Sequence, residues 1–236
     1  MSNIEHKLHT MLSIQDELNQ VVDPNWRDRG FRWEDAIVVE AVELFDHLPW
    51  KWWKKHTGSI DLEQAKLEAV DIWHFIMSDL MDCFDTDWVA KYLKGWVENH
   101  DENVNFAVTD HPNDIEYIKD AVRGFLTEAT FINHAAATPT DYVGSFFILL
   151  AELGITFDEL YTLYVAKTQL NRLRWANDYG GSYIKTWDGQ EDNVWLAEYV
   201  KTLDVDAPDF KDQVYAGLVA KYEEVKKAAS TGLSEE

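Results

Sequence analysis

The chain has 236 residues, of which 46% are hydrophobic and 27% charged, so it is long enough to bury one large core. With 43 acidic residues against 21 lysines and arginines, the formal net charge of −22 argues against a surface that binds nucleic acid, because such a surface needs positive charge. The single cysteine, Cys83, excludes a disulfide framework and a zinc site built from cysteines, and favours a reducing, cytoplasmic compartment.

The first predicted helix covers residues 3–22, in which apolar side chains recur at near-helical spacing with polar residues between them. Gln15 and Asn19 are four residues apart and therefore share one face of this helix. Taken alone, the two amides are interpreted as an exposed pair on a polar stripe, because amides are common on helix surfaces. The helix is expected to end before Pro24.

Two strongly apolar segments, residues 36–45 and 67–77, are expected to form the centre of the fold. Helices that are hydrophobic nearly all round lie in the middle of a domain, so polar side chains on them are expected to be enclosed rather than solvated. The polar residues lie three apart on one helical face of each segment: Glu40 and Glu43 in the first, and Glu68, Asp71 and His74 in the second.

Four carboxylates on two adjacent central helices carry a formal charge of about −4, which would protonate the acids or unfold the site unless cations compensate it. Two Mg²⁺ or Mn²⁺ ions would neutralise this charge, and both metals prefer oxygen ligands. A site of this kind typically presents a phosphate ester for hydrolysis. His74 is either a hydrogen-bonded core residue or, as we expect, a side chain that supports the acids or faces a substrate.

An aromatic and basic block, PWKWWKK at residues 49–55, follows the first acidic segment. Trp50 and Trp53 can share one side of a helical turn, with Lys54 close by. A single tryptophan usually fills core or dimer-interface volume. Three tryptophans within four residues, beside lysines, can instead stack a base while an ammonium group reaches a phosphate.

The remaining helices follow from hydrophobic periodicity and from start and stop signals. Two capping-box patterns, Asp61 with Gln64 and Thr156 with Glu159, open helices. A polar stretch before Ile115 is expected to be a loop. Beyond the first helix, helices are expected at residues 33–48, 61–83, 85–100, 115–133, 142–153, 156–175, 193–203 and 208–227.

A basic stripe lies on the helix of residues 156–175, where Lys167, Asn171 and Arg174 fall at i, i+4 and i+7. In a chain with so few basic residues, this stripe is a candidate anion site. The segment that follows, residues 177–193, contains three glycines that allow tight turns and close approach of backbone amides to a ligand. It lacks the spacing and the preceding strand of a P-loop, and a plain connector is the alternative.

No segment shows convincing period-two alternation or a βαβ rhythm, so the chain is expected to be all-α with eight or nine helices. A single domain over residues 1–236 is expected, with a frayed tail from about residue 229. No stretch approaches the roughly twenty apolar residues of a membrane span, and no basic leader opens the chain, so a soluble protein without membrane anchorage is expected.

Several sequence blocks, taken in order, resemble the dimeric, all-α dUTPases, which share the all-α nucleotide pyrophosphohydrolase superfamily with the MazG-type enzymes. They run from IQDELN at residues 14–19 through ExxE, PWKWWK and ExxDIWHF to GSYIKTWDGQEDN near the C-terminus. The resemblance implies a helical bundle that forms a homodimer and hydrolyses dUTP, and also dUDP, to dUMP. It also implies two or three Mg²⁺ ions per site, with Mn²⁺ as a substitute.

The resemblance assigns roles to individual residues where the blocks match. The metal ligands and catalytic residues would be Glu40, Glu43, Glu68 and Asp71, with Glu40 also orienting or deprotonating the attacking water. The nucleoside would be bound by Gln15 and Asn19 at the uracil edge, by Trp50 and Trp53 with Lys54 nearby, and by His74 at the deoxyribose. The phosphates would be gripped by Lys167, Asn171, Arg174, Tyr183, Lys185 and Asn193.

The mechanism that the resemblance implies is in-line attack of water on the α-phosphorus, with pyrophosphate leaving from dUTP while cationic side chains neutralise its charge. The sequence departs from the family pattern in two places. Ile184 stands where some relatives have a second basic residue, and residues 85–113 contain none of the blocks that carry the resemblance.

Three alternatives stay open. A relative acting on dCTP or another nucleotide would share the acids, because an amide such as Gln15 satisfies uracil in one orientation and cytosine in the other. A ferritin-like di-iron protein needs two carboxylate-x-x-His pairs, and only Asp71 with His74 fits. A non-catalytic network of acids and lysines would need more basic residues near the acids than the sequence provides.

Overall fold

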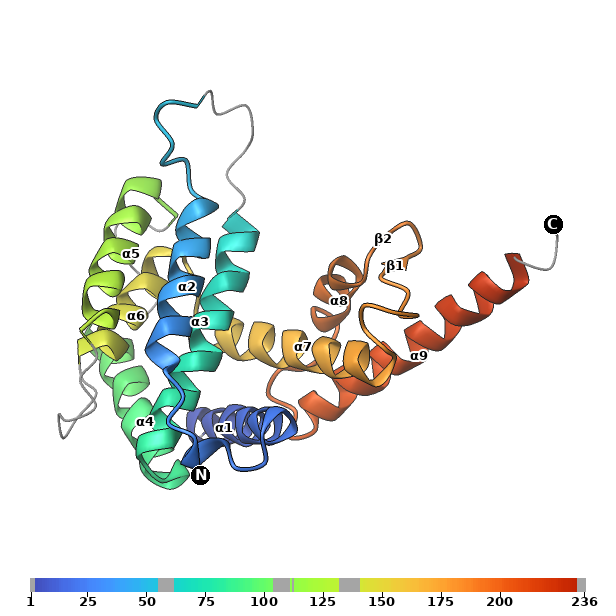
Figure 1. The fold of residues 1–236 in the computed structure, drawn as a ribbon, viewed down its shortest axis with the longest axis horizontal. Coiled ribbons are helices and arrows are strands. Elements are labelled where there is room, and N and C mark those ends of the chain that lie inside the picture. The colour runs from blue at the N-terminus through green and yellow to red at the C-terminus, as the bar shows by residue number, and fades with distance from the viewer. Residues whose placement is uncertain (1–2, 55–61, 104–110, 112, 132–140, 233–236) are drawn as a thin grey trace. The chain divides into compact units, whose positions relative to one another are not determined.

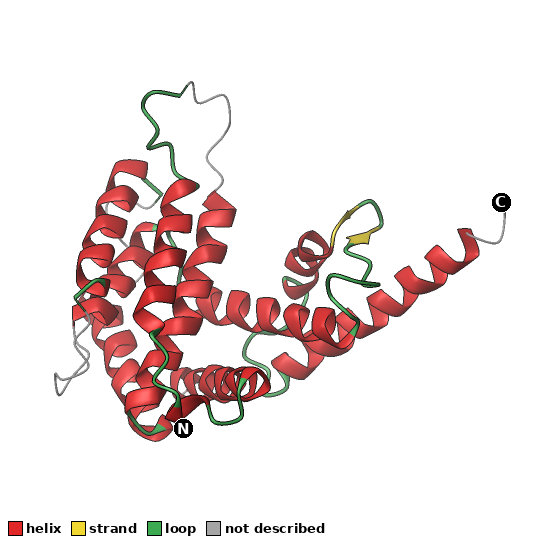
Figure 2. Ribbon diagram, viewed as in Figure 1, coloured by secondary structure: helices red, strands yellow, loops and turns green. Residues whose placement is uncertain are grey.

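The computed structural model describes residues 3–54, 62–103, 111, 113–131 and 141–232 (Figure 1). Within these residues the chain forms nine α-helices, one short 3-10 helix and one two-stranded hairpin, which confirms the all-α expectation (Figure 2). The chain divides into two compact units, Met1–Leu160 and Tyr161–Glu236. The single domain expected over residues 1–236 stays a prediction.

The first unit contains six helices, the 3-10 helix and the beginning of a seventh helix. Their bounds are α1 (Asn3–Val22), η1 (Trp26–Asp28), α2 (Trp33–Asp46), α3 (Leu62–Cys83), α4 (Thr86–Asn103), α5 (Ile115–Ala129), α6 (Asp141–Glu152) and α7 (Phe157–Ala176). Most predicted bounds agree with these within a few residues. Helix α4 continues three residues into the polar stretch that is expected to be a loop, and α5 ends four residues before its expected end. The predicted cap Asp61 lies outside the described residues.

The core of the first unit is centred on α3, which packs side by side with α2 and also contacts α1 (Figure 1). Trp73 of α3 is fully buried, and its ring stacks on Phe146 of α6 with centroids 5.6 Å apart. The Trp73 indole Nε1 also lies 3.4 Å from the sulfur of Met11 on α1. Large buried rings such as these supply much of the apolar burial that stabilises a fold.

The expectation that α2 is buried nearly all round is wrong. Ile37, Ala41 and Leu44 are buried, but Val39 and Val42 are each about half exposed. Because α2 packs on α3 and α5 along one side, its opposite side remains at the surface even though valines lie there. Sequence hydrophobicity therefore overstates how much of α2 the first unit encloses.

The second unit contains most of α7, the strands β1 (Thr186–Trp187) and β2 (Gln190–Glu191), and the helices α8 (Asp192–Val200) and α9 (Phe210–Gly232). The strands pair antiparallel around Asp188 and Gly189, both of which have positive φ. Asp-Gly is the sequence expected in a two-residue hairpin turn, although the strands are too short to show alternation. The hairpin buries Trp187, whose ring lies 5.9 Å from that of Tyr222 on α9.

Helix ends agree in part with the predicted signals. At the start of α7, Thr156 Oγ1 accepts a hydrogen bond from the Glu159 amide at 3.1 Å, as the capping box requires. The Glu159 carboxylate, however, pairs with Lys66 at 3.0 Å. At the other end of the chain, α9 continues to Gly232, past the start of the expected tail.

No helix of the described residues is long and apolar enough to cross a membrane.

Replacing Phe146 by alanine is expected to lower the free energy of unfolding by about 3 to 5 kcal/mol, because it removes a buried ring from the stack on Trp73. The control Ile148→Ala, on the same helix but at a side chain that is 53% exposed, is expected to cost less than about 1 kcal/mol. Urea unfolding followed by circular dichroism measures both. Equal losses would contradict the described packing.

Candidate active site

Three carboxylates meet where α2 packs on α3. Glu40 comes from α2, while Glu68 and Asp71 come from successive turns of α3, and one oxygen of each lies within 4.8 Å of the others. All three residues are partly buried. The sequence spacing places Glu68 and Asp71 on one face of α3, and helix packing brings that face against Glu40.

The chemistry of this acidic cluster fits a hard divalent cation. Three carboxylates so close together repel one another, and a cation removes that repulsion. Oxygen ligands of one octahedral Mg²⁺ are about 3 to 4 Å apart, given metal–oxygen distances of about 2.1 Å. Small rotations of the three side chains would therefore bring their oxygens onto one ion.

Glu43 is placed differently from the other predicted ligands. Its side chain is exposed, and it does not belong to the group formed by Glu40, Glu68 and Asp71 among the described residues. Residues three apart on an α-helix differ by about 60° around its axis, which turns Glu43 toward the open side of α2. Its role as a ligand stays a prediction.

His47 contacts the acidic cluster, and sequence reasoning missed it. Its Nε2 lies 3.2 Å from Glu68 Oε1, just beyond the end of α2. His47 follows Glu40 by seven residues, which is about two helical turns, so the two residues share one helical face. This spacing in the sequence could have identified His47 as a neighbour of the acids. A protonated His47 would pair with Glu68 as a cation, whereas a neutral His47 would hold the carboxylate by a hydrogen bond.

The interpretation of Gln15 and Asn19 as exposed amides is wrong, because both are at least 92% buried, with exposed fractions of 4% and 8%. They form a hydrogen-bonded group with two residues of α3. Gln15 Nε2 donates to Asn19 Oδ1 at 2.9 Å and to Ser78 Oγ at 3.0 Å, and Asn19 Nδ2 donates to Ser78 Oγ at 3.0 Å. Gln15 Oε1 lies 2.7 Å from His74 Nδ1.

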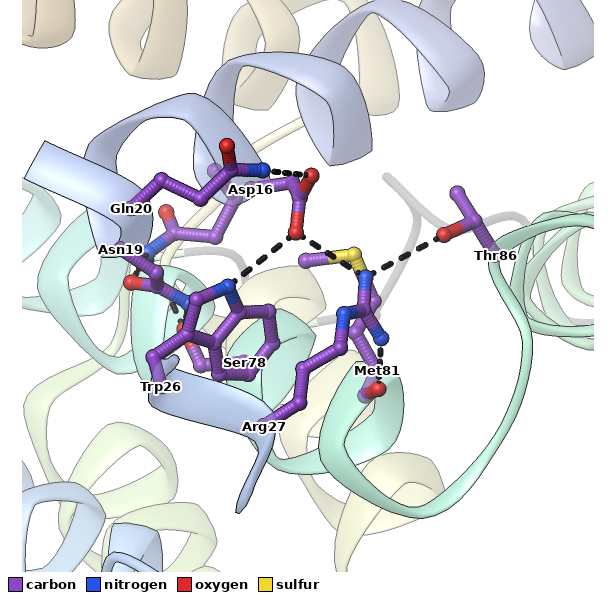
Figure 3. A network of polar contacts seen from close by, with 9 residues as sticks. Asp16, Asn19, Gln20, Trp26, Arg27, Ser78, Met81 and Thr86 are labelled. Carbon is purple, nitrogen blue, oxygen red and sulfur yellow. Dashed lines mark hydrogen bonds and ion pairs between the residues drawn. The ribbon is translucent and has the colours of Figure 1, made fainter. Parts of the chain in front are cut away.

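A second polar network lies beside this amide group and includes residues of η1, as Figure 3 shows. Asp16 of α1 accepts hydrogen bonds from the Trp26 indole at 3.2 Å and from Arg27 Nη2 at 3.0 Å. Arg27 also donates to the backbone carbonyl of Met81 at the end of α3 and contacts Thr86 at the start of α4. The network therefore ties the segment after α1 to the helices that carry the amides and Ser78.

The tryptophan block keeps its aromatic contacts without the helical turn that the sequence suggested. The described residues after α2 form turns rather than a helix. The rings of Trp50 and Trp53 nevertheless meet edge to face with centroids 5.4 Å apart, and Lys51 lies 5.1 Å above the Trp50 ring. Trp53 and Lys54 are exposed. Such a surface can stack a base. The role of Trp50 and Trp53 as a wall of the nucleoside pocket stays a prediction.

In the second unit, Asp192 accepts hydrogen bonds from several of the residues that are predicted to bind phosphate. Asp192 is fully buried and accepts hydrogen bonds from Arg174 Nε at 2.9 Å, from Arg174 Nη2 at 2.7 Å and from the Tyr183 hydroxyl at 2.8 Å. Burial alone would lower the pKa of Arg174, but hydrogen bonding to Asp192 raises it. Burial and the hydrogen bond to Asp192 also raise the pKa of Tyr183. Sequence reasoning missed Asp192, which lies beside the predicted Asn193.

The other predicted phosphate contacts lie around this buried carboxylate or at the surface. Asn171 Oδ1 lies 3.4 Å from Arg174 Nη1, and the backbone amide of Asn193 donates to Asp192 at 2.8 Å. Lys185 is exposed and pairs with Glu191 at 3.1 Å, while Lys167 is partly buried. The structure therefore brings Asn171, Arg174, Tyr183 and Asn193 together. The Lys185 carbonyl accepts a hydrogen bond from the Asp192 amide at 2.9 Å, but the Lys185 ammonium pairs with Glu191 instead of joining this group.

Fold and site together define an all-α protein whose packed acidic helices can hold divalent cations. A sequence model of the dUTPase family matches residues 7–179, so the chain belongs to this family, as the sequence blocks indicated. Membership makes the chain a hydrolase of the dUTP diphosphatase class at the level of the family. A search of curated proteins finds none that matches the chain.

The raised pKa of Tyr183 predicts how stability changes at alkaline pH. The unfolded phenol loses its proton near its ordinary value of 10.0, whereas the folded protein retains it. The contribution of Tyr183 to the free energy of unfolding is therefore complete below about pH 10. As pH rises further, the free energy of unfolding falls by at most about 1.4 kcal/mol per pH unit. Urea unfolding between pH 8 and 11 should show a steeper loss in the wild type than in Tyr183→Phe.

The exposed Tyr179 provides the control for this prediction. Tyr179→Phe should follow the wild-type slope, because the proton of interest stays on Tyr183. Parallel curves for the wild type and Tyr183→Phe would contradict a phenol held neutral by burial and Asp192.

Proposed function

We propose that this chain hydrolyses dUTP, and also dUDP, to dUMP in a reaction that depends on Mg²⁺. Pyrophosphate would be released from dUTP and phosphate from dUDP. The observation that carries the proposal is the meeting of Glu40, Glu68 and Asp71 on two packed helices, in a chain that belongs to the dUTPase family. Mn²⁺ would substitute for Mg²⁺, because both prefer oxygen ligands.

The acids would act together. Glu40, Glu68 and Asp71, with Glu43 as a further ligand, would hold two or three ions, and Glu40 would orient or deprotonate the attacking water. When bound, the divalent ions neutralise phosphate oxygens and lower the pKa of water. His47 would keep the Glu68 carboxylate in place through the contact between Nε2 and Oε1. An in-line attack on the α-phosphorus then requires no covalent intermediate.

The base and sugar would be recognised by the first unit. Gln15 and Asn19 are buried amides whose donors and acceptors suit the uracil edge. Trp50 and Trp53 would form a wall of the nucleoside pocket, and His74, which contacts Gln15, would face the deoxyribose. Discrimination by buried hydrogen-bonding groups is stronger than discrimination by apolar contacts, because a wrong base leaves those groups unpaired.

The phosphates would be bound by cationic and polar side chains. Lys54 and Lys185 are exposed, so their ammonium groups can move to a phosphate at little cost. Arg174 is fixed by Asp192, which prepares its remaining N–H groups for an anion. Lys167, Asn171, Tyr183 and Asn193 complete the set that the family resemblance assigns.

A homodimer is the proposed assembly, and the half-exposed Val39 and Val42 of α2 support it, because a second copy covering α2 would bury them.

The net charge of −22 supports the proposal that nucleic acid is not a partner. The single cysteine supports a cytoplasmic location.

Product analysis tests the reaction directly. The purified protein is expected to convert dUTP with Mg²⁺ into dUMP and pyrophosphate, and to act much more slowly on dCTP, dTTP and dATP. Excess EDTA should abolish the reaction, and added Mg²⁺ or Mn²⁺ should restore it. Release of single phosphates in sequence from dUTP would contradict the proposal, and faster turnover of dCTP would favour a cytosine-specific relative.

Substitution of the acids tests the proposed metal site. Glu40→Gln and Glu68→Gln should each lower kcat/KM for dUTP by at least about 100-fold, because each removes a charged ligand at nearly constant side-chain volume. Glu63→Gln, at an exposed acid in the first turn of α3, is the matched control and should leave kcat/KM unchanged. Glu43→Gln shows whether the fourth acid contributes, since a ligand would give a comparable loss.

A further inference from the structure

The hydroxyl of Ser78 occupies the centre of the buried amide group, although nothing in the sequence blocks drew attention to it. Ser78 is fully buried on α3, one turn beyond His74. Its Oγ lies 3.0 Å from Gln15 Nε2, 3.0 Å from Asn19 Nδ2 and 2.9 Å from the backbone carbonyl of His74 (Figure 3 shows Asn19 and Ser78). One hydroxyl therefore connects both amides to the backbone of α3.

The directions of the hydrogen bonds described above follow from the backbone carbonyl of His74. A carbonyl oxygen only accepts, so the single Ser78 hydrogen must point to His74 O. The lone pairs of Ser78 Oγ are then left to accept, which requires that both amides present their NH₂ groups to it. Gln15 Oε1 consequently faces His74 Nδ1, which must carry the ring proton.

The opposite orientation of the amides is excluded by the same hydroxyl. If both side chains were flipped, their bond to each other would survive in reverse, with Asn19 donating to Gln15. Two carbonyl oxygens would then face Ser78 Oγ at about 3 Å, while its only hydrogen is committed to His74 O. Buried acceptors without a donor are costly, so Ser78 selects one orientation.

We propose that Ser78 is a specificity-determining residue, which fixes the Asn19 amide in the orientation that accepts uracil and rejects cytosine. This inference rests on the proposed function. Asn19 has a second Nδ2 hydrogen and a second Oδ1 lone pair beyond the bonds described above. These match the O4 acceptor and the N3–H donor of uracil. Cytosine presents the N4 amino donor and the N3 acceptor there, so both contacts fail.

Ser78→Ala tests the proposal through the ratio of kcat/KM for dUTP to that for dCTP. Without the hydroxyl, the reversed network becomes available, with Gln15 donating to His74 Nδ1, so the ratio is expected to fall at least about 10-fold. Ser78→Thr retains the hydroxyl and should keep the wild-type ratio. Ser145→Ala, on α6, controls for loss of a helical serine hydroxyl elsewhere.

The outcomes separate the role of Ser78 from the reaction itself. Hydrolysis of dUTP with an unchanged ratio in Ser78→Ala overturns the role of Ser78 and leaves the proposed function standing. Equal turnover of dUTP and dCTP by the wild type also overturns it. A wild type that hydrolyses neither nucleotide overturns the proposed function and the specificity role together.

A second measurement requires no nucleotide. ¹⁵N NMR of the imidazole should show that His74 in the wild type carries its proton on Nδ1, whereas Ser78→Ala should show both tautomers. A wild-type His74 with an unprotonated Nδ1 would mean that Gln15 donates to the ring. That result would overturn the orientation on which the proposal depends, whether or not the protein is active.

Discussion

The packing of α2 against α3 imposes the constraint on which the site depends, because it forces three carboxylates into one small volume. Glu40, Glu68 and Asp71 are partly buried, and their oxygens lie within 4.8 Å of one another. The packing of α2 on α3, including the contact between the rings of Trp33 and Phe75 with centroids 6.3 Å apart, holds the two helices in that register. A bound cation would convert this repulsion into attraction, so the packing of the two helices gives the cluster the arrangement that a divalent ion could use.

Helix α3 links the acidic cluster to the buried amides through a single stripe of residues. Glu68, Asp71, His74 and Ser78 follow one another at spacings of three, three and four, which keeps them on one face. The stripe is about 15 Å long, given the rise of an α-helix. A rigid helix would thus fix the separation between the place where phosphate chemistry is proposed and the place where a base is proposed to be read.

The sequence was sufficient for the helices, the three clustered acids and the family, because periodicity and ordered motif blocks are local signals. It was insufficient where tertiary packing decides the outcome. The burial of Gln15 and Asn19 depends on α3 covering them, and the exposure of Val39 and Val42 depends on how little of α2 is covered. The β-hairpin was missed because its strands have two residues each, although its Asp-Gly turn was a usable signal.

Asp192 shows why the proposed phosphate contacts differ from one another in a chain so rich in acids. Lys185 pairs with Glu191 at the surface, and exposed ion pairs contribute little, so a phosphate can displace Glu191. Arg174 instead pairs with a fully buried carboxylate, and separating that pair would leave a buried charge without compensation. The guanidinium therefore stays on Asp192, and its contribution to an anion is limited to donors that point away from that carboxylate. Lys185 would supply the mobile charge, and Arg174 the fixed one.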